Sequence, residues 1–168
     1  MKYKVIAKHH NSKMCIVCGL KNPVGLHGGF YELENGQLVG IFKALPEHQG
    51  YPNILHGGIA SALLDETIGR AIMIREHKDF WGFTAEITVR FKKNIPIDQP
   101  IRVVGQITND RGRLFEGEGK ILLKDGTVAA EGSGKYLKVN LAQTGFNVDQ
   151  EEWKVTEYPD DPKEIELP

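Results

Sequence analysis

The sequence predicts an α+β domain in which an antiparallel sheet of about five to six strands wraps around one long central helix. Three short turns divide the chain into paired apolar segments, at residues 35–36, 110–112 and 125–126. One segment, residues 57–75, has the length and apolar content of a buried helix. A strand pair, then a single helix, then a run of strands is the order typical of such a fold.

The turns define five strands, because Asn-Gly and Asp-Gly sequences supply the positive φ angles that tight hairpin connections require. We expect strands on both sides of each turn, at residues 29–34, 37–44, 101–109, 113–124 and 127–139. Residues 84–93 predict a sixth strand. There, Ile87, Val89 and Phe91 alternate with polar neighbours, which is the pattern of a strand with one buried face.

The predicted helix is apolar on almost every side, so we expect it to be buried on most sides. Asp65 interrupts this apolar surface, and a carboxylate is costly to bury without a partner. The positions three and four residues away hold Ser61, Ala62, Ile68 and Gly69. None of these side chains can neutralise Asp65, and the small ones leave room beside it for a ligand or another backbone. Asp65 is therefore either the acid of an active site or a cap for a neighbouring loop.

Gly57 and Gly58 open this helix directly after His56. The first N–H groups of a helix have no intrahelical acceptor and lie at the positive end of the helix dipole. Glycines at this point let a carbonyl approach those donors closely, as acyl transfer requires. The alternative is that the glycine pair only forms the entry turn of the helix.

A single helix cannot bring both features to one carbonyl. Gly57 and Asp65 are eight residues apart, which corresponds to roughly 12 Å at 1.5 Å per residue. A second copy of the helix, packed antiparallel across a two-fold axis, would bring Asp65 of one copy toward Gly57 of the other. The sequence therefore favours a homodimer with two equivalent sites.

Three other charged residues each have two possible functions. Glu66 precedes Arg70 by four residues, which predicts an ordinary ion pair on the helix surface, and a catalytic role is the alternative. Arg90 and Lys92 lie at the end of the predicted sixth strand, where they could bind the phosphates of a nucleotide ligand. A solvated strand face is the alternative for this pair.

Cys15 and Cys18 form a single CxxC motif with His9 and His10 upstream. Two cysteines cannot form a disulfide scaffold in a chain of 168 residues, and a reducing compartment would keep them as thiols. We expect buried thiols and no metal, and zinc binding is the alternative. The other histidines are expected to have ordinary surface or loop roles; they are His27, His48 and His77.

Two segments together resemble a known family: HGGIASALLDE at residues 56–66 and TAEITVRFKKNIP at residues 84–96. They are similar to the hotdog-fold acyl-CoA thioesterases of the phenylacetate-pathway (PaaI-like) type, and the resemblance spans about residues 15–138. It implies a homodimer with a continuous sheet, with a dimer of dimers as a further possibility. It also implies hydrolysis of a CoA thioester to free acid and CoA.

The same resemblance implies roles for individual residues. Asp65 would be the nucleophile or general base, the Gly57 N–H would stabilise the oxyanion, and His56 would position the thioester. Thr84 matches a hydroxyl residue near the attacking water. Many relatives carry an asparagine about six residues before the histidine, where this chain has Gly50. The remaining expected substrate contacts are Gly58, Asn53, Arg90 and Lys92.

The predicted domain organisation is an N-terminal appendage containing the CxxC motif (residues 1–28), the hotdog domain (residues 29–139) and an acidic tail (residues 140–168). The tail holds eight acidic residues and two lysines, a net charge of −6. A net charge of −1 for the whole chain argues against nucleic-acid binding, and no apolar run is long enough for a membrane span. We expect a cytoplasmic enzyme without a cofactor.

Two other functions remain open. A non-catalytic, regulatory acyl-CoA-binding hotdog module would share the fold, but simple binding does not need the acid at Asp65. A hotdog dehydratase or hydratase would need a histidine and an acid that converge on a β-hydroxyacyl group.

Overall fold

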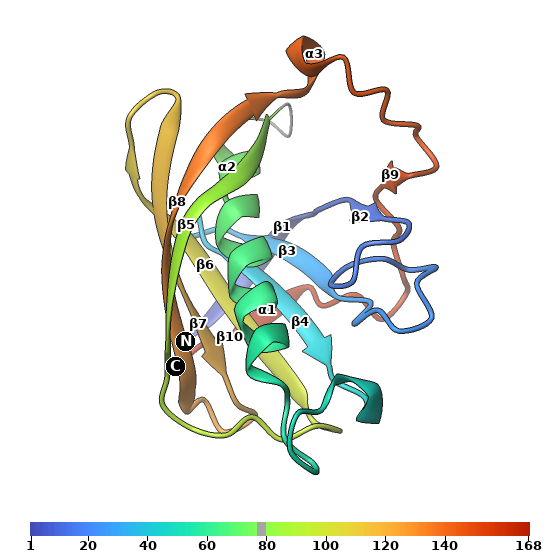
Figure 1. The fold of residues 1–168 in the computed structure, drawn as a ribbon, viewed down its shortest axis with the longest axis vertical. Coiled ribbons are helices and arrows are strands. Elements are labelled where there is room, and N and C mark those ends of the chain that lie inside the picture. The colour runs from blue at the N-terminus through green and yellow to red at the C-terminus, as the bar shows by residue number, and fades with distance from the viewer. Residues whose placement is uncertain (77–79) are drawn as a thin grey trace.

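The computed structural model describes residues 1–76 and 80–168, so His77 lies outside the described residues. Eight strands form one antiparallel sheet, in the order β10-β1-β3-β4-β6-β7-β8-β5 (Figure 1). Their bounds are β1 Lys2–Lys8, β3 Gly29–Leu33, β4 Leu38–Lys43, β5 Phe80–Phe91, β6 Pro100–Asp110, β7 Leu114–Leu122, β8 Val128–Asn140 and β10 Glu164–Glu166. The six predicted strands are all present, and the predicted α+β fold is confirmed.

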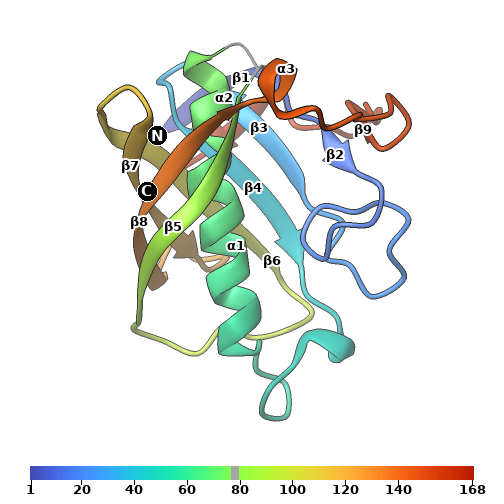
Figure 2. The ribbon, with the colours of Figure 1, turned by 45° about the horizontal axis from the view of Figure 1, so that its top comes forward.

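The central helix is α1 (Gly57–Arg70), which continues after Ala71 into the short α2 (Ile72–Arg75). The sheet curves around α1, which lies across its concave face (Figure 2). Leu63, Leu64 and Ile68 are fully buried between helix and sheet. Among the helices of the described residues, none has the length and apolar content needed to cross a membrane.

Glycines on the concave face of the sheet allow the helix to approach closely. A Cβ atom added to Gly105 of β6 would lie 2.9 Å from the Thr67 carbonyl oxygen, and one added to Gly117 of β7 would lie 2.6 Å from the Ile68 side chain. Both distances are shorter than Cβ contacts in proteins allow. The glycines therefore determine how deeply α1 sits against the sheet.

The hairpin turns form where the glycines predict them. Gly36, Gly112 and Gly126 have φ angles of 79°, 80° and 83°, which glycine adopts without the steric penalty of a side chain. The strand pairs that these turns connect are β3–β4, β6–β7 and β7–β8.

Residues 1–28 and 140–168, which were expected to lie outside the central domain, contribute strands to its sheet. β1 pairs with β3 and with β10, and the backbones of Met1 and Leu167 are hydrogen-bonded to each other. Ile165 and Leu167 are buried in a small core beside Leu33. The two termini therefore lie side by side (Figure 1).

The same two segments also form a separate two-stranded sheet, from β2 (Asn11–Ser12) and β9 (Trp153–Lys154). Trp153 contacts the rings of His10 and Trp81, which attaches this small sheet to the domain near the end of α1. The remaining elements are the 3-10 helix η1 (Pro46–His48), ahead of α1, and the one-turn helix α3 (Leu141–Thr144), after β8.

Candidate active site

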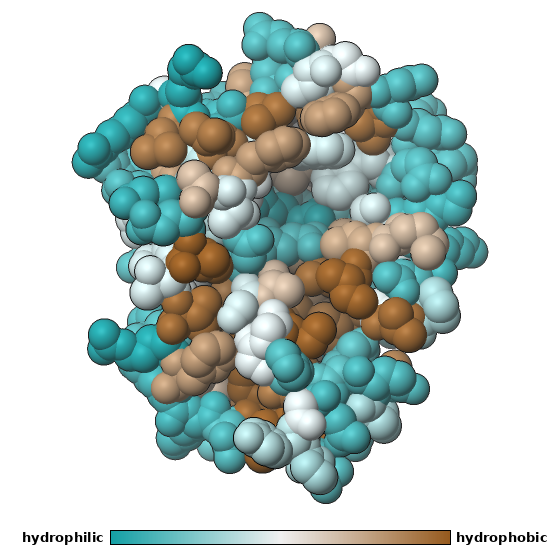
Figure 3. All heavy atoms as spheres, viewed as in Figure 1, coloured by the Kyte–Doolittle hydropathy of each residue, from teal (hydrophilic) through white to brown (hydrophobic). Residues whose placement is uncertain are grey.

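A pocket of about 340 Å³ lies between α1, the start of β5 and the N-terminal loop that carries the CxxC motif. Figure 3 shows hydrophobic side chains gathered on this face around a hollow. The residues that line the pocket are Ser12, Cys15, Cys18, Asp65, Glu66, Gly69, Arg70, Met73, Trp81, Gly82, Phe83, Thr84 and Trp153. Asp65 and Thr84, both predicted from the sequence, thus lie in one pocket.

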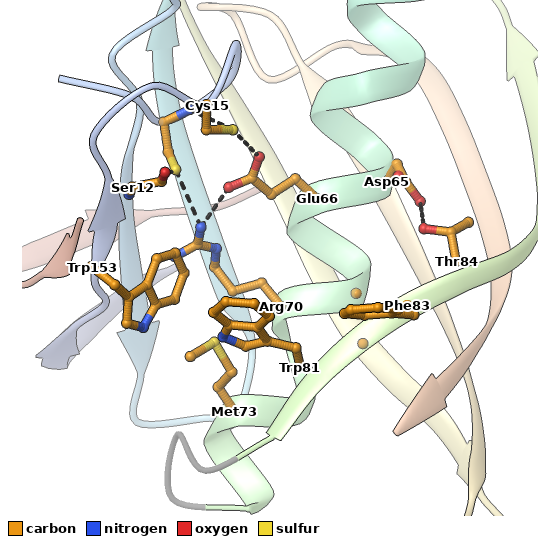
Figure 4. A pocket seen from close by; sticks show the side chains of 13 residues that line it. Ser12, Cys15, Asp65, Glu66, Arg70, Met73, Trp81, Phe83, Thr84 and Trp153 are labelled. Carbon is orange, nitrogen blue, oxygen red and sulfur yellow. Dashed lines mark hydrogen bonds and ion pairs between the residues drawn. The ribbon is translucent and has the colours of Figure 1, made fainter. Parts of the chain in front are cut away.

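Asp65 is half-buried on α1 and points toward Thr84 on β5 (Figure 4). The Thr84 hydroxyl donates a hydrogen bond of 2.8 Å to Asp65 Oδ1. This bond holds one carboxylate oxygen and orients the other. Thr84, which donates to Asp65 from the neighbouring strand, therefore lines the same pocket.

Tyr136 of β8 lies behind Asp65. Its hydroxyl donates to the backbone carbonyl of Asp65 at 3.4 Å. Burial, together with the nearby negative charge of Asp65, raises the pKa of Tyr136 well above its ordinary value. Tyr136 therefore stays neutral and acts as a fixed hydrogen-bond donor that supports the helix backbone at Asp65.

His56 and the two glycines lie at the other end of α1, outside this pocket. His56 caps the helix, because its Nδ1 atom accepts a 2.9 Å hydrogen bond from the Gly58 N–H. A Cβ atom at Gly58 would lie 3.0 Å from that nitrogen, so glycine gives the imidazole room to cap. An accepting Nδ1 leaves the ring proton on Nε2, from which His56 can donate. Within one chain, Gly57 and Asp65 are not brought together.

The other predicted substrate contacts are also outside the pocket. Asn53 adopts a left-handed conformation, with φ of 63°, in the loop before α1. Arg90 is exposed on β5. Lys92 follows β5 and forms an ion pair of 2.7 Å with Glu131, which holds the pKa of Glu131 below its usual range.

Glu66 forms the predicted ion pair with Arg70, at 2.5 Å. The structure adds a second contact, since the Cys15 thiol lies 3.2 Å from the other Glu66 oxygen. A hydrogen bond from Cys18 lowers the pKa of Cys15, although burial opposes this. The same bond, together with burial, raises the pKa of Cys18. The sequence alone does not indicate that Glu66 and the two cysteines lie together.

Several pocket residues were missed from the sequence. Trp81 and Phe83 belong to β5, which begins at Phe80 and not at the predicted residue 84. The aromatic segment FWGF directly before the predicted strand was the available signal. Trp153 reaches the pocket from the acidic tail, and nothing local in the sequence indicates that long-range contact.

Residues 52–130 match the profile of the thioesterase superfamily. Among curated proteins, the acyl-coenzyme A thioesterase THEM4 of Bos taurus is 25% identical over 116 residues, which are 66% of this chain and 45% of that protein. The chain therefore spans about half the length of this curated relative.

Many solved structures are similar to the chain, and three illustrate the range of similarity. A thioesterase-superfamily protein has 26% identity and a TM-score of 0.67, covering 74% of this chain and 60% of the other. Escherichia coli PaaI has 14% identity and a TM-score of 0.61, covering 68% and 81%. A hypothetical thioesterase of Streptococcus pneumoniae, solved with coenzyme A, has 16% identity and a TM-score of 0.57, covering 62% and 82%. The chain has the hotdog fold, and its residues 52–130 are similar to the thioesterase superfamily.

Proposed function

We propose that this chain is an acyl-CoA thioesterase, which adds water to a CoA thioester and releases a free acid and CoA. The observation that carries the proposal is the Asp65–Thr84 pair in the wall of the pocket on the central helix. The superfamily match, the resemblance to an acyl-CoA thioesterase and the similarity to a protein solved with coenzyme A support it. The structural similarity to PaaI, at 14% identity, supports a shared fold alone, so a PaaI-like substrate is part of the proposal only.

In this proposal Asp65 is the catalytic carboxylate. Its Oδ1 atom accepts from Thr84, so Oδ2 faces the thioester as a nucleophile or takes a proton from an attacking water. Both routes place negative charge on the thioester oxygen. When Asp65 acts as a base, the carbon–sulfur bond breaks and the proton that Asp65 took from water passes to the departing CoA thiolate. When Asp65 acts as a nucleophile, the CoA thiolate leaves an acyl-Asp65 anhydride, and water then hydrolyses this anhydride to the free acid and the Asp65 carboxylate, its second proton going to the thiolate.

A second copy of the chain supplies the oxyanion donor. β5 lies at the end of the sheet order and pairs only with β8 among the described residues, so its other edge is free to pair. The exposed side chains of Phe83 and Phe91 lie on this strand. Pairing of two β5 strands across a two-fold axis would continue the sheet and bring Gly57 of one copy toward Asp65 of the other. His56 Nε2–H would then position the thioester from the same helix end.

The CoA moiety would bind near the helix start. Arg90 and Lys92 offer positive charge to its phosphates, and Asn53 and the Gly58 backbone lie in or next to the loop that precedes α1. To bind a phosphate, Lys92 must either release Glu131 or donate a second N–H of its ammonium group to the phosphate while the ion pair with Glu131 persists. We further propose that the enzyme acts in the cytoplasm and that two dimers can associate.

The experiment that tests the proposal is a free-thiol release assay with CoA thioesters of varied chain length and aromaticity. We expect catalytic release of CoA from at least one class. If calorimetry detects acyl-CoA binding while no class releases thiol, the chain is an acyl-CoA-binding module and the proposal is wrong. Hydration of an enoyl-CoA in the absence of thiol release would instead favour a hydratase.

A further inference from the structure

The CxxC loop and the central helix place three ligand-type atoms together. The two cysteine sulfurs and a carboxylate oxygen of Glu66 all lie within 4.8 Å of one another. In a tetrahedral zinc site, with zinc–sulfur bonds near 2.3 Å and zinc–oxygen bonds near 2.0–2.2 Å, ligand atoms are about 3.5–3.8 Å apart. The Cys15 sulfur and Glu66 Oε2 are 3.2 Å apart, close to this spacing.

Backbone N–H groups lie close to both sulfurs. The N–H groups of Val17 and Cys18 lie 3.3 and 3.5 Å from the Cys15 sulfur. The Ser12 N–H lies 3.4 Å from the Cys18 sulfur. Such donors fix the orientation of a metal ligand and balance its charge. The loop is thus folded around the two sulfurs before any ion is bound.

Arg70 orients the third ligand. Its Nη2 atom donates to Glu66 Oε1 at 2.5 Å and to the Cys18 sulfur at 3.4 Å, while the guanidinium lies over the Phe30 ring. Glu66 Oε2 is thereby directed toward Cys15 (Figure 4). Two thiolates and one carboxylate carry three negative charges and Arg70 carries one positive charge, so a divalent cation neutralises the cluster.

We propose that Cys15, Cys18 and Glu66 bind a zinc ion whose fourth coordination position is open to the pocket. Two thiolates and a carboxylate suit zinc and exclude the hard cations magnesium and calcium. On binding, each thiol loses its proton to solvent, and the ion forms one bond to each sulfur and one to the carboxylate. All three ligands line the pocket, so water or a bound ligand can reach the open position.

A disulfide between the two cysteines is the competing use of this motif. Its formation would remove the thiol proton with which Cys15 faces Glu66 Oε2, and would leave that partly buried carboxylate oxygen without this partner. The geometry therefore favours the metal. The site joins the N-terminal loop to α1, one residue from Asp65, and it does not depend on the proposed thioesterase activity.

The test uses the purified full chain, reduced and stripped with a chelator, without any acyl-CoA. We expect one zinc ion per chain by elemental analysis after zinc is restored and excess removed. Cobalt should give the sulfur-to-metal charge-transfer absorption and the visible bands of tetrahedral coordination. Zinc should also protect both cysteines from a thiol reagent.

Three variants locate the ligands. Cys15→Ser and Cys18→Ser should each abolish the charge-transfer band of tetrahedral cobalt bound to two sulfurs, and Glu66→Gln should weaken zinc binding by about tenfold or more. Glu152→Gln is the matched control, because it removes an exposed carboxylate from an ion pair with Lys13 near the same loop. It should bind zinc as the unmodified chain does.

The proposal is overturned if cobalt gives no charge-transfer band in the unmodified chain. It is also overturned if both thiols react with the reagent as fast at saturating zinc as they do without zinc, or if air oxidation yields a disulfide in a chain that never binds zinc. These readouts come from the unmodified chain, so they decide the matter even if a variant fails to fold. Zinc binding without thioester hydrolysis would contradict the proposed function alone.

Discussion

Asp65 combines two properties on the central helix. It is half-buried beside fully buried leucines, and one of its oxygens is already fixed by the Thr84 hydroxyl. A structural aspartate would be expected to have its charge neutralised by a cation or by backbone N–H groups. Asp65 instead faces a pocket, with Thr84 oriented by a strand that packs beside the helix.

The substitution Asp65→Asn should lower kcat for thioester hydrolysis at least about 100-fold, because a general base or nucleophile contributes on the order of 10² to 10⁴ in rate. The amide is nearly isosteric and can still accept from Thr84, so acyl-CoA should bind with unchanged affinity. Steady-state thiol release and calorimetric titration measure the two quantities. Glu118→Gln, an exposed carboxylate on β7, is the control and should retain full turnover. Normal turnover in a folded Asp65→Asn protein would remove Asp65 from the mechanism.

At the scale of elements, the position of α1 depends on the sheet glycines beneath it. Gly105→Ala places a methyl group 2.9 Å from a backbone oxygen of the helix, which cannot rotate away. We expect the free energy of unfolding to fall by about 1–3 kcal/mol. Urea denaturation measures this, with Lys120→Ala, exposed on β7, as the control. An unchanged midpoint would mean that the helix shifts without cost.

Hydrogen bonds to Asp161 hold the C-terminal segment against the sheet. Asp161 accepts hydrogen bonds from the Lys8 ammonium and the Tyr31 hydroxyl, which belong to β1 and β3. Burial alone would raise the pKa of Asp161, but the bonds from Lys8, the Tyr158 N–H and Tyr31 outweigh it and hold the pKa below its ordinary value. The ionised carboxylate therefore attaches the segment before β10 to the sheet.

Asp161→Asn should lower the free energy of unfolding by about 1–3 kcal/mol at neutral pH. Because the folded-state pKa is depressed, the stability from Asp161 is present above the unfolded-state pKa and is lost as the pH falls through the folded-state value. The difference between the two proteins should accordingly shrink in acid. Asp160→Asn, the exposed neighbour, is the matched control for urea denaturation at each pH. A difference that is constant down to the lowest pH would exclude this linkage.

Local patterns predicted the elements that depend on local chemistry. Gly36, Gly112 and Gly126 indicated their turns because glycine is favoured at positive φ, and the apolar segment after Gly57 indicated the central helix. β1 and β10 were missed, because short terminal strands acquire their stability from pairing with each other and with β3. When two distant segments pair, the sequence of neither segment shows a local pattern that predicts the pairing.

The candidate site, too, was predictable only in part from the sequence. Asp65 was recognisable because a lone carboxylate conflicts with its apolar helix, and Thr84 because of the resemblance to a family. Trp153 and the clustering of Glu66 with the two cysteines depend on how three distant segments pack. Such contacts follow from tertiary structure and have no periodicity in the sequence.

For the whole molecule, the central question is where the proposed oxyanion donor of each site comes from. One chain holds Asp65 and Gly57 at separate places on one rigid helix, and the free edge of β5 offers a route to a second copy. A shared site makes each chain incomplete by itself. This arrangement predicts that two inactive chains can complement each other.

Gly57→Pro removes the proposed oxyanion donor with little disturbance. Gly57 is the first residue of α1, where proline is well tolerated because that N–H has no intrahelical acceptor. His56 has φ of −61° and ψ of 134°, which a residue before proline readily adopts. An added Cβ would come no closer than 3.5 Å to Phe91. Gly57→Ala, which retains the N–H, is the matched control and should keep most of its activity.

Gly57→Pro and Asp65→Asn should each be nearly inactive alone, yet active when the two chains are co-expressed. In a mixed dimer, the intact Asp65 of one chain meets the intact Gly57 of the other, which restores one of the two sites. Random assortment of equal amounts makes half of the dimers mixed, so thiol release should recover to about one quarter of the unmodified rate. Native mass spectrometry verifies the mixed dimers. If they form and activity does not return, each site is built within a single chain and the two-fold arrangement is wrong.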